Sequence, residues 1–138
     1  MTGVPKQVIT ITGDINNKDD FGHDLPFSDG VLVDKTLYLS GRVGIDPASG
    51  RAATDPEMEV RFMLDSVKSV LHKAGMTMDD LSYVQVYCTD LSLFDFFNRV
   101  YRGYFSSQFP ARAFLGASSL LLGARFEICA VATKPPSP

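Results

Sequence analysis

The sequence predicts an α+β domain in which two helices cover one face of a mixed β-sheet. Segments with strand and helix patterns follow one another as strand, hairpin, helix, strand, helix, strand and strand, so strands outnumber helices. With 138 residues, the chain suits one domain that buries enough surface to fold without a disulfide or a metal. Two helices cannot cover both faces of such a sheet. We therefore expect its other face to be solvated or buried against another subunit.

The first part of the chain has the pattern of strands joined by polar loops. Val8–Thr12 alternates β-branched residues and predicts the first strand. Val31–Val33 and Leu37–Leu39 predict two short strands that form a hairpin. Polar and turn-forming residues predict two loops, at 13–25 and 41–53.

The first helix has clear start and stop signals. Thr54-Asp55-Pro56-Glu57 combines an N-cap candidate, a proline near the first helical position and an acid in the first turn. Apolar residues then recur at helical spacing from Val60 to Ala74, which gives the helix one apolar face. Gly75 fits the C-terminal stop.

The second half of the chain predicts one more helix and the remaining strands. Ser92–Phe105 carries an aromatic stripe at helical spacing, with Ser92 as its candidate N-cap. Strands are predicted at Leu81–Thr89, Ala113–Gly116 and Phe126–Ala132. The final segment, Lys134–Pro138, is a Pro-rich tail that cannot pair in a sheet.

Composition disfavours several classes of function. The net charge of −3 gives no electrostatic attraction to nucleic acid, so we expect no nucleic-acid partner and no ribonuclease activity. Cys88 and Cys129 belong to no metal-binding motif, and we expect no metal site. No apolar run reaches the ~18 residues that span a membrane, and the N-terminus lacks the apolar core of a signal peptide. We therefore expect a cytoplasmic protein with no membrane partner.

Five short stretches match the motifs of one known family in order and spacing. They are Leu25-Pro26-Phe27-Ser28 for GPYSQ, Thr36–Gly41 for lyvSGQ, Asn98–Phe105 for N-x-x-Y-x-x-(Y/F)-F, Phe109-Pro110-Ala111-Arg112 for FPAR, and Phe126-Glu127-Ile128 for (I/V)-E-(I/V). Together they resemble the YjgF/YER057c/UK114 family, also called Rid (reactive intermediate deaminase) and formerly endoribonuclease L-PSP or translation initiation inhibitor. The resemblance covers about 26–133 within a single expected domain, residues 1–138.

The resemblance implies a fold, an assembly and an activity. The fold is chorismate-mutase-like (bacillus type), in the order β-β-β-α-β-α-β-β. The assembly is a homotrimer with ligand clefts between subunits. Family members that are enzymes hydrolyse reactive 2-enamino or 2-imino acids, such as 2-aminoacrylate, to 2-keto acids and ammonia without a cofactor. We therefore expect a cofactor-independent enamine/imine deaminase.

Two residues are predicted to carry the chemistry. A guanidinium such as that of Arg112 binds a carboxylate through two parallel hydrogen bonds, and a 2-imino acid presents a carboxylate beside its C=N bond. An ion pair at a subunit interface, or a side chain that reaches to water, is the alternative for Arg112. Glu127 lies in a predicted strand, and the resemblance implies that it orients the attacking water. A solvent-facing charge on an edge strand is its alternative.

Further residues are predicted to contact the substrate. Together with Arg112 they are Phe27, Ser40, Gly41, Asn98, Ala113 and Phe114. The resemblance places Asn98 near the cleft, although a helix-surface position is the alternative. Ser40 and Gly41 end a strand, where they bind substrate atoms or form a turn. The backbone around Ala113 is expected to supply N–H donors.

Three departures from the family motifs bear on the substrate. Phe27 replaces a tyrosine, and Phe114 stands where many members have a small residue. Arg42 replaces a glutamine and is expected to add a second cation near the site or at an interface. These changes leave open a larger enamine acid, such as 2-aminomuconate. A non-catalytic trimeric module that binds small carboxylates or acts in regulation is the alternative from another functional class.

Overall fold

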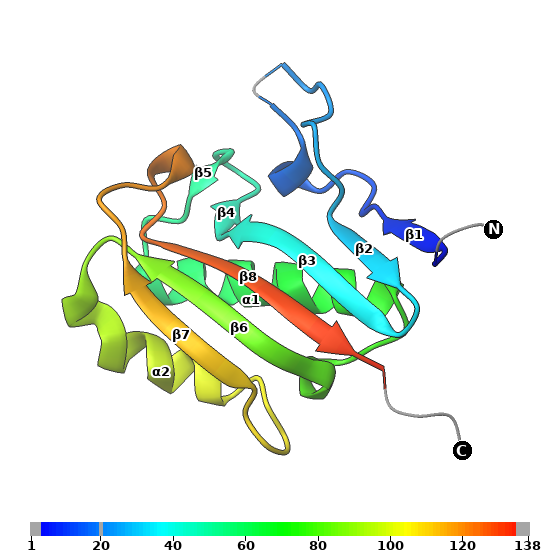
Figure 1. Ribbon diagram of the computed structural model, residues 1–138. Helices are drawn as coiled ribbons and strands as arrows, with labels where there is room; N and C mark the ends of the chain where they lie inside the picture. Colours follow the sequence, from blue (N-terminus) through cyan, green and yellow to red (C-terminus); the bar gives the residue numbers. More distant parts are fainter. Residues whose placement is uncertain (1–3, 20, 135–138) are drawn as a thin grey trace.

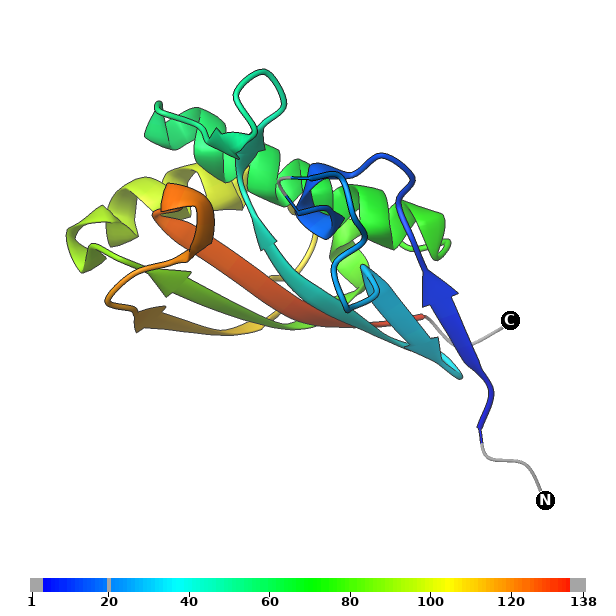
Figure 2. The same cartoon turned by 90° about the horizontal axis from the view of Figure 1, so that it is seen from above.

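Two helices lie on one face of a six-stranded sheet, and the opposite face is uncovered (Figures 1 and 2). The computed structural model describes residues 4–19 and 21–134. The elements in chain order are β1 (Lys6–Ile9), η1 (Ile15–Asn17), β2 (Gly30–Val33), β3 (Thr36–Val43), β4 (Ile45–Asp46), β5 (Arg51–Ala52), α1 (Pro56–Lys73), η2 (Met78–Asp80), β6 (Leu81–Cys88), η3 (Leu91–Leu93), α2 (Phe94–Arg102), β7 (Ala111–Gly116), η4 (Leu121–Gly123) and β8 (Phe126–Thr133). The α+β class and the mixed sheet predicted from the sequence are confirmed.

The sheet has the strand order β1-β2-β3-β8-β6-β7, with β4 and β5 forming a separate small ribbon. All pairings in the large sheet are antiparallel except that of β6 with β7. Parallel neighbours need a crossover connection, and α2 supplies it between β6 and β7. This crossover places α2 over the β7 edge of the sheet, beside the predicted FPAR motif (Figure 1).

α1 forms where its local signals predicted it. Asp55 is the N-cap and accepts a hydrogen bond from the N–H of Met58 at 3.2 Å, and Pro56 is the first helical residue. Gly75 follows the helix with a φ of 75°, a conformation that glycine adopts without steric cost. The buried side of α1 faces the sheet and includes Glu59, Val60, Met63, Leu64, Val67, Val70 and Leu71.

The hydrophobic core lies between the helices and the sheet. Alternate residues of each strand point into it, as β8 shows by burying Phe126, Ile128, Ala130 and Ala132. The intervening residues point to the face without helices, which we call the open face. It carries large apolar side chains that are at least one-third exposed: Tyr38, Tyr83 and Leu115.

Several element boundaries differ from the sequence predictions. The first strand is Lys6–Ile9, because the N–H of Ile11 bonds to the Asp29 carboxylate and not to a neighbouring strand. β3 continues to Val43, beyond the predicted Leu39, because its last residues pair with β8 after a bulge. The predicted loop at 41–53 therefore contains the end of β3 and the β4-β5 ribbon.

α2 is shorter than its prediction. The segment begins as η3, in which Asp90 accepts a bond from the N–H of Ser92 at 3.0 Å, so Ser92 is not the N-cap of α2. α2 ends at Arg102 instead of Phe105. Of the predicted Pro-rich tail, residues 135–138 lie outside the described residues. Among the residues that are described, none belongs to a helix long and apolar enough to cross a membrane.

Candidate functional site

Arg112 lies on β7 and points to the side of the sheet that α2 covers. Its backbone pairs with Val84, a fully buried residue of β6, which fixes the face to which its side chain points. Four aromatic rings surround its guanidinium carbon: Tyr101 at 4.8 Å, Phe114 at 5.3 Å, Phe94 at 5.7 Å and Phe97 at 5.8 Å. Such ring faces attract a cation but leave its N–H groups free to bind an anion.

A cavity of about 210 Å³ opens beside Arg112. Its lining residues are Asn98, Tyr101, Arg102, Phe109, Pro110 and Arg112. Within residues 4–19 and 21–134, Arg112 makes no ion pair. A structural salt bridge within these residues therefore does not account for its position. The cavity therefore offers a free guanidinium, flanked by the predicted Asn98, to a ligand carboxylate.

Tyr101 lines this cavity, although its place in the aromatic stripe and in the N-x-x-Y-x-x-(Y/F)-F motif did not predict it as a site residue. The residue is buried, and its hydroxyl has no hydrogen-bond partner in the part of the chain that is described. Burial raises the pKa of Tyr101 to about 12, and the positive charge of Arg112 opposes this shift only in part. The hydroxyl is therefore protonated at neutral pH.

Glu127 lies on β8 and points to the open face, where it borders a second cavity of about 300 Å³. The cavity is lined by Ile15, Asn16, Lys18, Leu25, Phe27, Ser40, Gly41, Val43, Leu121, Leu122 and Glu127. Burial raises the pKa of Glu127 above its ordinary value. No described residue forms an ion pair with this carboxylate. Glu127 is thus a partly desolvated acid beside an open space.

Two predicted site residues shape the space around Glu127. A Cβ atom at Gly41 would lie 2.6 Å from Glu127 Oε2, so the carboxylate occupies space that only glycine leaves free. Ser40 donates its hydroxyl hydrogen to the carbonyl of Ser28 at 2.5 Å, which leaves only its oxygen lone pairs for a ligand. Phe27 borders the same cavity and is 44% exposed.

The remaining predicted contacts are divided between the two sides of the sheet. Ala113 pairs with Gln85 and points to the open face, away from the Arg112 cavity. Phe114 packs edge-on against Phe94 and Phe97 and lies beneath the guanidinium, outside the lining of either cavity. Phe114 therefore supports Arg112 and does not narrow the cavity of one chain.

A single chain does not bring Arg112 and Glu127 together. Arg112 pairs with Val84, whereas Glu127 pairs with Tyr87, three residues further along β6. β6 lies between the two strands that carry them, so their backbones are ~10 Å apart across the sheet and ~10 Å apart along it. Their side chains also point to opposite faces. One ligand therefore cannot contact both residues of the same chain without a change of structure.

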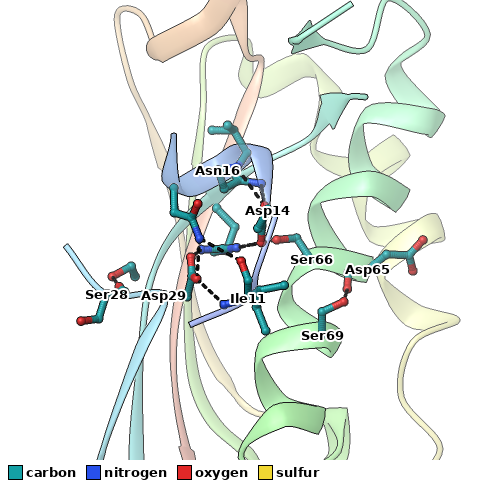
Figure 3. A network of polar contacts seen from close by, with 12 residues as sticks. Ile11, Asp14, Asn16, Ser28, Asp29, Asp65, Ser66 and Ser69 are labelled. Carbon is teal, nitrogen blue, oxygen red and sulfur yellow. Dashed lines mark hydrogen bonds and ion pairs between the residues drawn. The ribbon is translucent and has the colours of Figure 1, made fainter. Parts of the chain in front are cut away.

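The prediction that Arg42 adds a second cation near the site or at an interface is wrong. Its side chain is fully buried and lines neither cavity. It forms ion pairs with Asp14 and Asp29 and a hydrogen bond with Ser66. Figure 3 shows these three partners. The two aspartates carry no local signal for this role, because each becomes a neighbour of Arg42 only in the folded chain.

Potential metal ligands are dispersed in the structure. Among the residues that the structure describes, no three His, Cys, Asp or Glu side chains gather in a group that could hold a metal ion. The polar groups of the two cavities are instead suited to an organic anion, through Arg112, and to a water molecule, through Glu127.

Comparison with known proteins identifies relatives over most of the chain. The family model described as Endoribonuclease L-PSP matches residues 18–134. The human 2-iminobutanoate/2-iminopropanoate deaminase is 38% identical over 112 residues, which cover 80% of this chain and 82% of the human protein.

Solved structures show the same fold. The conserved Rid-family protein YyfA from Yersinia pestis, a protein of unknown function, matches with a TM-score of 0.81 at 30% identity and covers 94% of this chain and 100% of its own. TdcF from E. coli, solved with bound serine, matches with a TM-score of 0.80 at 25% identity and covers 94% of this chain and 99% of its own.

Proposed function

The chain belongs to the endoribonuclease L-PSP family, the Rid family of the motifs above, and from this membership we propose that it hydrolyses 2-imino and 2-enamino acids to 2-keto acids and ammonia. The human relative carries a name that describes this reaction on two small imino acids. The single observation that carries the proposal within this chain is that the guanidinium of Arg112 lies beside a cavity and pairs with no acid among the described residues.

Arg112 binds the substrate carboxylate. Two parallel N–H···O bonds from one guanidinium fix both the position and the plane of a carboxylate. The aromatic rings around Arg112 hold the guanidinium without neutralising it, so the anion that completes its bonding comes from the ligand. The serine bound to the related E. coli TdcF also has an α-carboxylate, which supports a ligand of this class.

Glu127 positions the attacking water. Its carboxylate accepts a hydrogen bond from water and directs the water oxygen to the imine carbon. Attack forms a C–O bond and breaks the C=N π bond, and Glu127 takes a proton from the water and passes it to the nitrogen, which gives a carbinolamine. The hydroxyl proton of the carbinolamine then moves to the amine nitrogen as the C–N bond breaks, which releases ammonia and the 2-keto acid. An enamine reaches the same route after tautomerisation to the imine. The reaction consumes only water, and orientation of the two reactants accounts for much of its acceleration.

The complete site contains residues of two chains. Arg112 and Glu127 of one chain lie on opposite faces of the sheet, and the open face carries large apolar side chains. Assembly through this face, in the homotrimer that the family resemblance implies, allows the Arg112 cavity of one copy to meet the Glu127 cavity of the next. The cleft between subunits is then the place of reaction.

The proposal is tested with imino acids generated in situ by an amino-acid oxidase. We expect the wild-type protein to accelerate the release of ammonia and 2-keto acid, and Arg112→Ala to lose at least ~10-fold in kcat/KM, mostly through KM, because the carboxylate loses a charge-assisted bidentate contact. Arg112→Lys keeps the charge but not the planar fork, so we expect an intermediate loss.

Arg99→Ala is the matched control. Arg99 also contacts an aromatic ring, that of Phe96, but lines neither cavity, so this variant should retain wild-type rates. Equal rates for wild type and Arg112→Ala would contradict the deaminase proposal. If the wild-type protein binds 2-keto acids in calorimetry but accelerates no small or large imino acid, a non-catalytic carboxylate-binding module is the better description.

A further inference from the structure

A loop near the N-terminus, described over residues 10–19 and 21–29, is attached to the sheet through a buried ion cluster. Arg42 of β3 donates from Nη1 to Asp29 at 2.6 Å and from Nε to Ser66 of α1 at 2.9 Å, and its Nη2 contacts Asp14. Figure 3 shows Asp14, Asp29 and Ser66 pointing toward one another from the loop and from α1. We call the following residues the Arg42 cluster: Asp14, Asn17, Asp29, Arg42 and Ser66.

Asp29 binds the loop from within the cluster. Its second carboxylate oxygen accepts bonds from the N–H of Ile11 and from Asn17 Nδ2, both at 2.8 Å. Burial by itself raises the pKa of Asp29, but the bonds from Ile11, Arg42 and Asn17 outweigh it and hold the pKa below its usual value. Asp29 is therefore ionised at neutral pH and, being buried, depends on the cation of Arg42.

The same loop forms one wall of the Glu127 cavity. Asn16 and Phe27 both line it. Asn16 follows Asp14 by two residues, and Phe27 precedes Asp29 by two residues. The Asn16 side chain also accepts a bond from the N–H of Val43 at 3.0 Å, while the N–H of Asn16 bonds to Asp14 at 2.8 Å. Cluster and wall are thus connected by short, hydrogen-bonded segments.

We propose that Arg42 is a positioning residue for the Glu127 cavity: it holds both ends of the loop against β3 and so fixes the wall that faces the water beside Glu127. Removal of Arg42 leaves two carboxylates, of Asp14 and Asp29, without their cation. An uncompensated charge is not tolerated in such an interior, so the loop detaches to hydrate the carboxylates. The catalytic consequence of this proposal rests on the proposed function.

Loss of Arg42 is expected to affect the attack of water and not the binding of the substrate carboxylate. Arg42 lies near the cavity that holds the water, whereas the carboxylate of the substrate binds at Arg112, on the other face of the sheet. A displaced wall misplaces water and imine carbon relative to each other, and a misplacement of about 1 Å costs about 100-fold in rate. We therefore expect the loss in Arg42 variants to appear in kcat, with KM changed far less.

The test compares Arg42→Gln with the double variant Arg42→Gln/Asp29→Gln. The family motifs SGQ and GPYSQ carry glutamine at both positions, so the double variant replaces the Arg42–Asp29 ion pair by the neutral pair of those motifs. We expect Arg42→Gln to lose 10- to 100-fold in kcat, estimated as about 100-fold per ångström of misplacement, and to show faster hydrogen exchange at the N–H groups of Ile11 and Asn16. The double variant should recover part of both losses, because it removes the more deeply buried of the two carboxylates and leaves only Asp14 without a cation.

Leu81→Ala is the control for general destabilisation. Leu81 is a buried residue at the opposite end of the sheet, paired with Ala132, and its truncation costs stability without touching the cavity. At conditions where every variant is folded, Leu81→Ala should keep the wild-type kcat. A wild-type kcat and unchanged exchange in Arg42→Gln would overturn the proposal, as would a kcat loss no larger than that of Leu81→Ala.

The exchange measurement separates this proposal from the proposed function. If the wild-type protein hydrolyses no imine, the deaminase proposal fails, yet exchange at Ile11 and Asn16 in Arg42→Gln still shows whether Arg42 holds the loop. If the wild-type protein is active and Arg42→Gln keeps both its kcat and its protected loop, only the positioning role of Arg42 is refuted.

Discussion

Arg112 and Arg42 illustrate how the surroundings of a residue decide its role. Both side chains lie among packed residues, but Arg42 meets two aspartates, whereas Arg112 meets aromatic rings and no acid of the described chain. A guanidinium without an anion near a cavity remains available to a ligand, and one with two buried carboxylates does not. The sequence places both arginines within family motifs and does not distinguish these environments.

Glu127 is predicted to give the pH profile of the reaction an acid limb at a pH above the ordinary glutamate pKa. Burial raises the pKa of its carboxyl, and only the ionised form can take a proton from the attacking water. We therefore expect kcat/KM to fall as the pH is lowered through this raised pKa, at a pH above the ordinary glutamate value of about 4.3. A pH profile of kcat/KM measures the position of the limb.

Glu127→Gln is the control for that profile. The amide has nearly the same shape but does not ionise, so the variant should lose about 100-fold or more in rate and have no acid limb of its own. An acid limb that persists unchanged in Glu127→Gln would assign it to the substrate imine or to another group. A limb at the ordinary glutamate pKa would contradict the influence of burial.

The motifs contain residues of both cavities but do not predict that the cavities are separate. Asn98 borders the cavity of Arg112, and Ser40 borders the cavity of Glu127. The assignment of Arg112 and Glu127 to opposite faces depends on strand register, which arises from pairing between distant segments. The partners of Arg42 were missed for the same reason, because no local spacing connects Asp14 with Asp29.

At the scale of elements, short sequence signals predict the boundaries of an element correctly where these boundaries depend on neighbouring residues. α1 begins and ends where its cap, proline and glycine predict, since each signal acts within a few residues. The end of β3 is the opposite case, because Arg42 and Val43 pair with β8, more than eighty residues later in the chain. This pairing extends β3 through a segment whose composition suggests a loop.

The N-cap of α1 provides a test of stability at this scale. Asp55→Ala removes the acceptor of the Met58 N–H, and we expect it to lower the free energy of unfolding by about 0.5–2 kcal/mol. Urea unfolding at a fixed protein concentration measures the change. Glu57→Ala, which loses an exposed ion pair with Arg61, should cost less than Asp55→Ala. Equal costs would show that the cap is not a significant source of stability.

At the scale of the whole molecule, the open face is the feature that an isolated chain leaves unexplained, because it exposes apolar side chains to solvent. Tyr38, Val131 and Tyr83 are direct neighbours across β3, β8 and β6, and they form an apolar row through the middle of this face. Tyr38 is 53% exposed and Tyr83 is 38% exposed in the single chain. Contiguous apolar surfaces of this kind are typical of protein interfaces, and this one supports the proposed assembly through the open face.

Val131→Asp tests assembly and activity together. The wild-type protein should have a mass of about three times the 15.1 kDa chain in light scattering. A carboxylate in the middle of the apolar row would be desolvated on assembly, so the variant should fold as a monomer and lose imine hydrolysis, because its two cavities no longer meet. Val4→Asp changes a valine that is 61% exposed outside the sheet and should leave both properties intact. A monomeric Val131→Asp that keeps full activity would place the whole reaction within one chain and refute the cleft between subunits.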